Sequence, residues 1–208
     1  MKITMICGSP RKKHSTSLYL LNALTEMLES GNEIKLYDAW NADAAQPILE
    51  GLSDSGALVI ACPLYVDSLP SNLLEVLAGL EKGLREATWA RAAKVYLLVN
   101  NGFYDAIQNR IAIDQLWKWC DRCGLQRGSA IGIGAGGMIQ MFPVGKGPFT
   151  ELGKAFRRLA GHIQNGRLEE TVFIEPNFPR RLYQMAAHAG WRKSVKANGL
   201  KASDLTRT

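Results

Sequence analysis

Short apolar runs alternate with helical periods along this chain, and this alternation limits the possible folds more than any other feature. Four runs are apolar on both faces, which is typical of strands buried between two layers of helices. These runs are residues 3–7, 57–62, 95–99 and 130–134. A fifth run, residues 33–38, alternates polar and apolar side chains, which indicates a half-covered strand at the edge of a sheet.

Apolar residues recur at helical spacing between these runs. They form four sets: Leu18, Leu21, Leu24 and Leu28; Leu73, Leu77, Leu80 and Leu84; Ile107, Ile111, Leu116 and Cys120; and Leu152, Phe156, Leu159 and Ile163. Gly124 and Gly166 follow the third and fourth sets, where a glycine C-cap is expected. The connection after the edge run is poorly marked, so we expect only a short helix there, within residues 44–52.

The order of these elements predicts the fold class. Right-handed crossovers fold a chain of alternating strands and helices into a parallel sheet with helices on both faces. We predict an α/β fold with a doubly wound, five-stranded parallel sheet in the order 2-1-3-4-5. Ligands of such sheets bind at the carboxyl ends of the strands, where the strand order reverses. We assign residues 1–174 to this domain and residues 175–208 to a C-terminal extension.

The net charge of +6 belongs almost wholly to the extension. Residues 1–174 hold 18 Lys and Arg against 17 Asp and Glu, and residues 175–208 hold 7 against 2. A basic extension is either a solvated arm that packs on its own body or a partner subunit, or a contact for nucleic acid or another anionic surface. A nucleic-acid footprint interleaves basic and aromatic side chains. The extension offers few aromatics, Tyr183 and Trp191 among them, so we expect no nucleic-acid partner.

Composition excludes several other classes of protein. No stretch of about 18 apolar residues is present, so we expect no membrane partner. The apolar run at the N-terminus is short and ends without a small-x-small cleavage site, unlike a signal peptide. Four cysteines in 208 residues form no dense disulfide pattern, which favours a reduced, cytoplasmic chain.

The loop after the first run, within CGSPRKKHSTSLYLL, has the composition of an anion site. It leads directly into a helix N-terminus, where N–H groups and the helix dipole favour an anion. Its hydroxyl donors are Ser9, Ser15, Thr16 and Ser17, and Arg11 supplies a planar cation that suits phosphate oxygens. The alternative is that Ser15 only caps the helix while the charges lie in solvent. The loop lacks the spacing of a Walker A motif, which argues against a nucleoside triphosphate.

Two further loops follow the third and fourth strands of the predicted order. Residues 63–70 are uncharged except for Asp67 and include the flat ring of Tyr65. Residues 100–105, NNGFYD, combine amide donors, two aromatics and a glycine that lets backbone approach closely. A phosphate loop beside two aromatic loops predicts a site for a monophosphate attached to a flat heterocycle.

These motifs resemble a known family. The loop GSPRKKHST resembles the GSPR-x-x-x-S/N-T loop of flavodoxin-like NADPH-dependent FMN reductases and related flavoproteins. The run PLYVDSLPSNLLEVL resembles their P-x-Y-x-x-x-x-P-x-x-L segment, and NNGFYD resembles, less specifically, their third flavin loop. The similarity follows the element order over roughly residues 1–174. The remainder looks like an extension of some bacterial members, and iron–sulfur relatives differ in a cysteine cluster that this chain lacks.

The resemblance implies a role for each matching residue. The FMN phosphate would be held by Ser9, Arg11, Ser15, Thr16 and Ser17. The isoalloxazine ring would be lined by Pro63, Leu64, Tyr65 and Val66, and its pyrimidine end would meet Asn101, Gly102 and Phe103. One departure is Ser15, which stands where asparagine is common and therefore shortens a donor.

The resemblance also implies an activity. We expect an FMN-dependent oxidoreductase that takes hydride from NADPH or NADH and reduces a quinone, a nitro or azo compound, or free flavin. The chemistry is carried by FMN, so we expect no catalytic side chain and no metal. A homodimer is expected, because a single subunit would leave the outer flavin face open. One alternative is a flavodoxin-type electron carrier, which the near-neutral body disfavours. The other is a non-enzymatic binding module that uses the basic extension.

Two further motifs are interpreted as structural. Residues 132–137 match G-x-G-x-x-G but begin inside the last predicted strand, and no acid follows at dinucleotide-binding spacing. We expect a closely packed strand end and a mobile loop that borders the flavin. Cys120 and Cys123 form a C-x-x-C near a predicted helix end, with no second pair to complete a metal site, so we expect two buried small residues.

Overall fold

The computed structural model describes residues 1–11, 13–28, 31–88, 92–201 and 203–204. The chain divides into two compact units, Met1–Pro176 and Asn177–Thr208. Among the described residues, none of the helices combines the length and apolarity that a membrane span requires.

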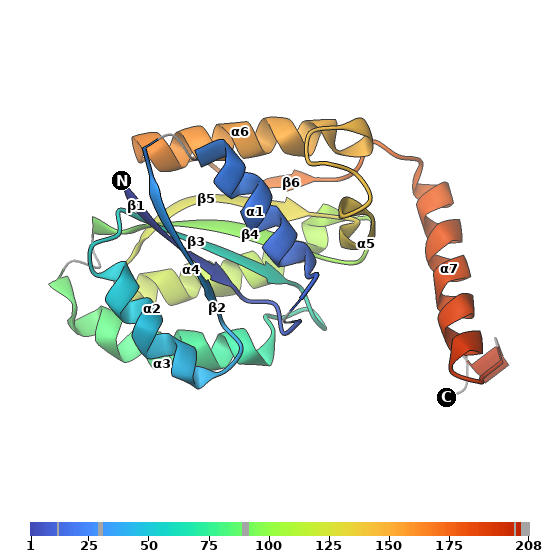
Figure 1. Ribbon diagram of the computed structural model, residues 1–208, viewed down its shortest axis with the longest axis horizontal. Helices are drawn as coiled ribbons and strands as arrows, with labels where there is room; N and C mark the ends of the chain where they lie inside the picture. The colour runs from blue at the N-terminus through green and yellow to red at the C-terminus, as the bar shows by residue number, and fades with distance from the viewer. Residues whose placement is uncertain (12, 29–30, 89–91, 202, 205–208) are drawn as a thin grey trace. The chain divides into compact units, whose positions relative to one another are not determined.

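The first unit is built on one parallel sheet (Figure 1). Its strands are β1 (Lys2–Cys7), β2 (Glu33–Asp38), β3 (Ala57–Pro63), β4 (Lys94–Asn100), β5 (Gln126–Ile133) and β6 (Val172–Ile174). Their order is β2-β1-β3-β4-β5-β6. The doubly wound α/β class and the order of the first five strands are therefore confirmed.

The sixth strand corrects the predicted count of five. β6 continues the sheet in parallel beyond β5, with Gly132 opposite Phe173. Its three residues are too few to show a strand period, so sequence patterning alone could not separate them from a connecting segment.

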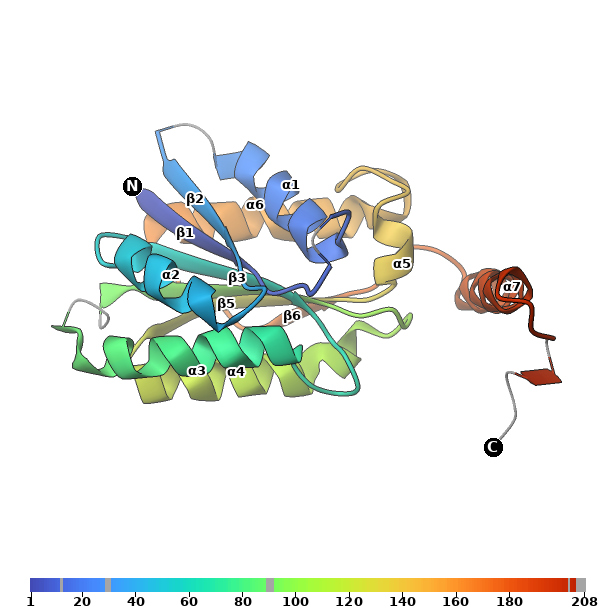
Figure 2. The same ribbon diagram turned by 60° about the horizontal axis from the view of Figure 1, so that its bottom comes forward.

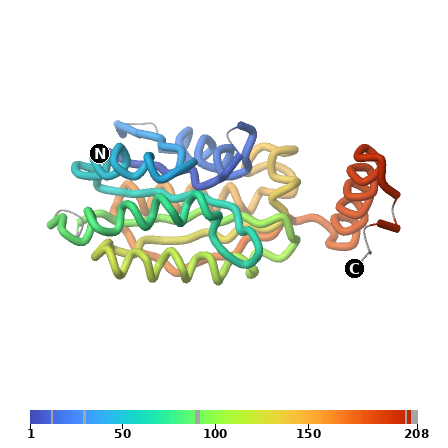
Figure 3. Tube along the Cα trace, turned by 90° about the horizontal axis from the view of Figure 1, so that it is seen from below, coloured from blue at the N-terminus to red at the C-terminus, as the bar shows by residue number. Residues whose placement is uncertain are grey.

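Helices cover both faces of the sheet (Figure 2). The helices of the first unit are α1 (Thr16–Leu28), α2 (Ala45–Leu52), α3 (Ser71–Glu86), α4 (Arg110–Cys123), α5 (Gly136–Ile139) and α6 (Thr150–Asn165). Helices α1 and α6 lie on one face, and α2, α3 and α4 lie on the other, where α3 and α4 run side by side (Figure 3). The predicted C-caps are confirmed, since Gly124 and Gly166 have φ angles of 71° and 60°.

Burial along the strands follows the predicted layering. All seven residues of β3 are buried, as are six of the seven in β4. Strand β2 contains no buried residue, in keeping with its alternating sequence and its place at the edge. The layered core therefore holds the carboxyl ends of β1, β3 and β4 side by side, and the loops that leave these ends share one edge of the sheet.

The second unit consists of helix α7 (Arg180–Ala197) and the residues on either side of it. None of the α7 residues is buried. The helix ends at Asn198 and is followed by Gly199 with φ of 74°, a left-handed conformation that suits glycine after a helix.

Candidate functional site

A cavity of about 200 Å³ lies at the carboxyl ends of the central strands. Its lining residues are Ser9, Arg11, Ser15, Thr16, Ser17, Pro63, Leu64, Tyr65, Asn100, Asn101, Gly102, Gly136 and Gly137. The three loops singled out from the sequence thus meet around one cavity. A fourth wall, formed by Gly136 and Gly137 after β5, and the side chain of Asn100 were not among the predicted site residues.

The first loop is organised by hydrogen bonds from its own backbone. The Leu18 N–H donates to Ser15 Oγ at 3.1 Å, so Ser15 is the N-cap of α1. The Arg11 N–H donates to Ser9 Oγ at 3.2 Å. Both serines are almost fully buried, with 2% and 3% exposure, and both line the cavity. Ser15 therefore both caps α1 and lines the cavity.

The two walls at either side of the first loop are tied to it through side chains. Ser17 Oγ donates to Asn100 Oδ1 at 2.9 Å, at the end of β4. Thr16 Oγ1 donates to the carbonyl of Gly136 at 3.2 Å, in the loop after β5. These bonds join segments 83 and 120 residues apart in the chain and set the width of the cavity.

Non-glycine residues with a left-handed backbone conformation are concentrated in these loops. Among the described residues, four non-glycine residues have a positive φ: His14, Val66, Asp67 and Ala135. A left-handed non-glycine residue is uncommon and costs on the order of 1 kcal/mol or more, and such strain tends to collect at functional sites. All four lie in loops that contribute to the cavity walls, and none lies in the core helices or strands.

A tight turn orients the second loop. Tyr65 and Ser68 exchange two backbone hydrogen bonds, at 3.0 and 3.1 Å, with Val66 and Asp67 between them. Tyr65 lines the cavity, together with Pro63 and Leu64. Val66 is 99% exposed and is not among the lining residues. Sequence reasoning grouped the four residues because it could not see that the turn directs Val66 to solvent.

The third loop uses its amide side chain to hold its own shape. Asn101 Oδ1 accepts a hydrogen bond from the Phe103 N–H at 2.9 Å, and Asn101 Nδ2 donates to the Asp105 carbonyl at 3.0 Å. Asn101 and Gly102 line the cavity, whereas Phe103 is 60% exposed and does not. A Cβ added at Gly102 would meet no atom within 4 Å, so packing does not require glycine there.

Close packing, predicted for the end of the last strand, extends to Gly136 in the glycine-rich segment after β5. A Cβ at Gly136 would lie 2.6 Å from the Asn101 carbonyl oxygen, and the Gly136 N–H donates to that oxygen at 2.7 Å. A Cβ at Gly137 would meet nothing within 4 Å. The glycine run GIGAGG was the sequence signal for this wall, and it reflects close backbone approach rather than a dinucleotide fingerprint.

Among the described residues that line the cavity, Arg11 carries the one cationic side chain. Behind the first loop, burial raises the pKa of the Cys7 thiol. Burial also raises the pKa of Asp38, which faces Cys7 from the neighbouring strand. Both shifts have the direction that burial produces, since burial disfavours the charged form of a thiol or a carboxyl.

The remaining cysteines are structural. All four cysteines are buried and free, and burial raises the pKa of Cys123 to about 12. A thiol with a raised pKa and no exposure is a poor nucleophile and a poor metal ligand. Among the described residues, no group of three or more His, Cys, Asp or Glu side chains could hold a metal ion.

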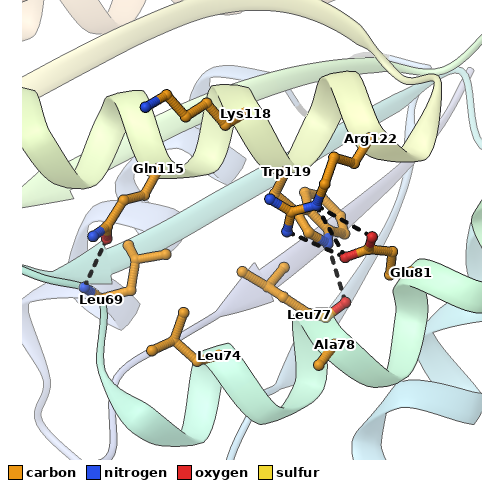
Figure 4. Close-up of a pocket in the computed structure, with 9 residues that line it drawn as sticks. All are labelled: Leu69, Leu74, Leu77, Ala78, Glu81, Gln115, Lys118, Trp119 and Arg122. Carbon is orange, nitrogen blue, oxygen red and sulfur yellow. Dashed lines mark hydrogen bonds and ion pairs between the residues drawn. The ribbon is translucent and has the colours of Figure 1, made fainter.

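A larger hollow of about 360 Å³ lies between α3 and α4 and shares no lining residue with the cavity at the strand ends (Figure 4). Its polar groups already bond to one another: Arg122 forms a bidentate pair with Glu81, and Trp119 Nε1 donates to the Leu77 carbonyl at 3.0 Å. The Leu69 N–H donates to Gln115 Oε1 at 3.4 Å. No set of free polar groups converges there, so the smaller cavity at the strand ends is the better candidate site.

Comparison with known proteins supports the same region. Residues 1–102 match the family model described as NADPH-dependent FMN reductase. This match spans the first two cavity loops and reaches Gly102 in the third. Among curated proteins, none matches this chain.

Solved structures share the fold at low sequence identity. The apo form of an NADH:FMN oxidoreductase aligns with a TM-score of 0.62 at 16% identity, over 81% of this chain and 91% of that one. The NAD(P)H:quinone oxidoreductase from Methanothermobacter marburgensis aligns with a TM-score of 0.59 at 18% identity, over 79% and 96%. A flavodoxin mutant from Pseudomonas aeruginosa aligns with a TM-score of 0.55 at 13% identity, over 79% and 99%. The chain thus has a flavodoxin-like fold, and its residues 1–102 carry the sequence pattern of the NADPH-dependent FMN reductases.

Proposed function

We propose that this protein is an FMN-dependent oxidoreductase that takes hydride from NADPH or NADH. The observation that carries the proposal is the cavity at the strand ends. There a hydroxyl-rich loop with one arginine meets two loops whose lining residues are uncharged and include the ring of Tyr65. The match to NADPH-dependent FMN reductases over residues 1–102 supports it independently.

The residues present fit FMN in both chemistry and arrangement. The phosphate end would be received by the loop that carries Ser9, Arg11, Ser15, Thr16 and Ser17. The ring would lie against Pro63, Leu64 and Tyr65, with Asn101 and Gly102 at its pyrimidine end. Phe103 and Val66 stand at the exposed rim, where they would gain contacts only from a bound ring or from another molecule. Two buried polar side chains support the fit. Ser9 and Ser15 line the cavity although they are almost fully buried, so their hydroxyls lie where a phosphate would be bound.

When bound, FMN supplies the two-electron redox chemistry, which no side chain of this cavity provides. The protein's own part is to bind and orient. Loop–loop hydrogen bonds hold the cavity at a fixed width, and the first turn of α1 directs its N–H groups toward an anion. Pro63 and Leu64 are buried and exclude water from the inner wall.

The acceptor is proposed as a class. We propose a quinone, a nitro or azo compound, or free flavin. Solved structures with this fold include a quinone oxidoreductase and an azoreductase, which supports the quinone and the azo compound. The fold is also shared with a flavodoxin, so an electron carrier without hydride chemistry is the second candidate. The neutral charge balance of residues 1–174 favours the enzyme over the carrier.

We further propose a homodimer in a reducing, cytoplasmic setting. Tyr65, Val66 and Phe103 expose 42%, 99% and 60% of their surfaces at the rim of the cavity, and clustered apolar exposure marks interaction surfaces. The four free cysteines suit a reducing compartment. Sedimentation velocity on the full chain tests the dimer, and a monomer at all accessible concentrations would contradict it.

The deciding experiment is the visible absorption spectrum of the purified protein loaded with FMN, recorded anaerobically before and after NADPH and then NADH. Bleaching by a nicotinamide is the expected result and identifies the donor. A yellow protein that neither donor bleaches would favour the electron carrier. A protein that cannot be loaded with FMN would overturn the assignment of the cavity.

A further inference from the structure

Each serine or threonine hydroxyl has one proton to donate, so a hydroxyl that already donates to the protein has none left for a ligand. Four serine and threonine residues line the cavity: Ser9, Ser15, Thr16 and Ser17. Their present hydrogen bonds divide them into two pairs.

The first pair already donates its protons. Ser17 Oγ donates to Asn100 Oδ1 at 2.9 Å, and the two side chains belong to residues that are 1% and 5% exposed. Thr16 Oγ1 donates to the Gly136 carbonyl at 3.2 Å and also accepts from Gln140 Nε2 at 3.4 Å. Diverting either proton to a ligand would leave a carbonyl or amide oxygen without its donor, which is unfavourable when that oxygen is buried.

The second pair accepts hydrogen bonds and keeps its protons. Ser9 Oγ accepts from the Arg11 N–H, and Ser15 Oγ accepts from the Leu18 N–H. The other neighbour of Ser15 Oγ is Cys7 Sγ at 3.8 Å, a weak acceptor. Both hydroxyls are therefore able to donate into the cavity without breaking an existing bond.

We propose a division of labour within this loop: the hydroxyls of Ser9 and Ser15 bind the phosphate, and the hydroxyls of Thr16 and Ser17 are positioning groups. Thr16 and Ser17 tie the first loop to the segments after β5 and β4. Their backbone N–H groups, in the first turn of α1, lack intrahelical partners and stay available to an anion. This proposal rests on the proposed function, because it assumes that the ligand carries a phosphate.

The proposal changes what each substitution does. Loss of a phosphate-binding hydroxyl weakens FMN but not riboflavin, which lacks the phosphate. Loss of a positioning hydroxyl moves whole loops, so it weakens both flavins alike and leaves their ratio unchanged. The ratio of the riboflavin Kd to the FMN Kd therefore separates the two roles, and it is independent of catalytic activity.

The experiment measures both Kd values by quenching of flavin fluorescence for the full chain and its variants. We expect Ser9→Ala and Ser15→Ala each to lower the ratio about tenfold, since a hydrogen bond to a charged group contributes on the order of 1.4 kcal/mol or more. Ser15→Asn, which keeps a helix cap and a donor, should retain most of the ratio. Thr16→Val and Ser17→Ala should leave the ratio within about twofold while both Kd values rise.

Matched variants make each outcome decisive. Ser53→Ala removes an exposed hydroxyl that donates to the Glu50 carbonyl at 2.8 Å, and it should change neither Kd. Thr16→Val tests loss of a positioning hydroxyl at a second residue, which covers the case that Ser17→Ala fails to fold. A ratio lowered by Thr16→Val as far as by Ser15→Ala would overturn the division of labour. A ratio near one in the unchanged protein would instead overturn the proposed phosphate site.

Discussion

Gln140 lies 126 residues after His14 in the chain, yet its side-chain Nε2 donates to the His14 carbonyl oxygen at 3.1 Å. His14 is left-handed, with φ of 55°, and it sets the direction in which the following residues enter α1. The segment after β5 therefore restrains a strained residue in the candidate phosphate loop, and it does so through a side chain that no sequence motif marks.

We expect Gln140→Leu to weaken FMN and riboflavin together, by about threefold, because it removes two exposed hydrogen bonds, to the His14 carbonyl and to Thr16 Oγ1, that position the loop without contacting a ligand. Flavin fluorescence titrations measure both Kd values. Gln46→Leu is the matched control, since Gln46 is also an exposed amide with a single side-chain partner, Glu50 at 2.9 Å. Identical titrations for the two variants would show that Gln140 does not position the site.

We expect Arg11→Ala to weaken FMN about tenfold or more and to leave riboflavin nearly unchanged. Arg11 is the one charged residue among the described lining residues, and charge-assisted bonds from arginine to phosphate are strong. Arg11 is exposed, so the difference should shrink as salt is raised from low to molar concentration.

The control for Arg11 is Arg110→Ala, at the exposed start of α4 and outside the cavity lining. It tests whether a change in net charge alone affects FMN. If Arg11→Ala lost FMN and riboflavin binding equally, the proposal that Arg11 binds the phosphate would be contradicted.

We expect Gly136→Ala and Gly137→Ala to differ in stability although they are neighbours. A Cβ at Gly136 would lie 2.6 Å from the Asn101 carbonyl oxygen, so backbone must shift, at a cost on the order of 1–3 kcal/mol. A Cβ at Gly137 would meet nothing within 4 Å, and its cost should lie within about 0.5 kcal/mol of zero. Urea unfolding measures both, and equal midpoints would contradict the close packing of the fourth wall.

We expect stability to fall between about pH 10 and pH 12 partly because of Tyr96, whose ring is fully buried and whose hydroxyl donates to the His162 carbonyl at 3.1 Å. Burial raises the pKa of Tyr96 to about 12 from its ordinary value near 10. The folded state thus keeps the proton longer than the unfolded state. Its contribution is complete below pH 10 and is lost as pH rises through 12, by about 2–3 kcal/mol for a shift of this size.

The measurement is the free energy of unfolding in urea at several pH values from 8 to 11.5. Tyr96→Phe should be less stable than the unchanged protein at pH 8, because it lacks the hydrogen bond, but should lose less stability as pH rises. Tyr65→Phe, at an exposed position, should follow the unchanged protein. Parallel curves for Tyr96→Phe and the unchanged protein would show that Tyr96 does not contribute to the alkaline loss.

Most of the fold was predictable from the sequence because burial leaves a local signature. The continuous apolar runs at β3 and β4, the alternating run at β2 and the glycine C-cap of α4 each follow from a period of a few residues. The class of the sheet and the order of its first five strands followed from these elements. β6 was missed because three residues hold too little pattern to distinguish a strand from a connection.

The candidate site was predictable only in part. Parallel strands place their carboxyl ends at one edge, so the sequence determined that three particular loops would be neighbours, and ten of the twelve predicted residues line one cavity. It could not place Val66 and Phe103, whose directions depend on a tight turn and on the amide of Asn101. These two residues' roles in binding remain predictions, as do those of the other ten.

What the sequence determined by itself is the layered α/β architecture and the chemical character of its loops, because periodicity and composition are properties of neighbours in the chain. What only the tertiary structure decided is the state of each polar group at the strand ends. Thr16 donates a hydrogen bond to Gly136, 120 residues away in the chain, and Ser17 donates one to Asn100, 83 residues away. A hydrogen bond is directional and short, so it depends on where the distant partner lies to within a few tenths of an ångström, which no local pattern encodes.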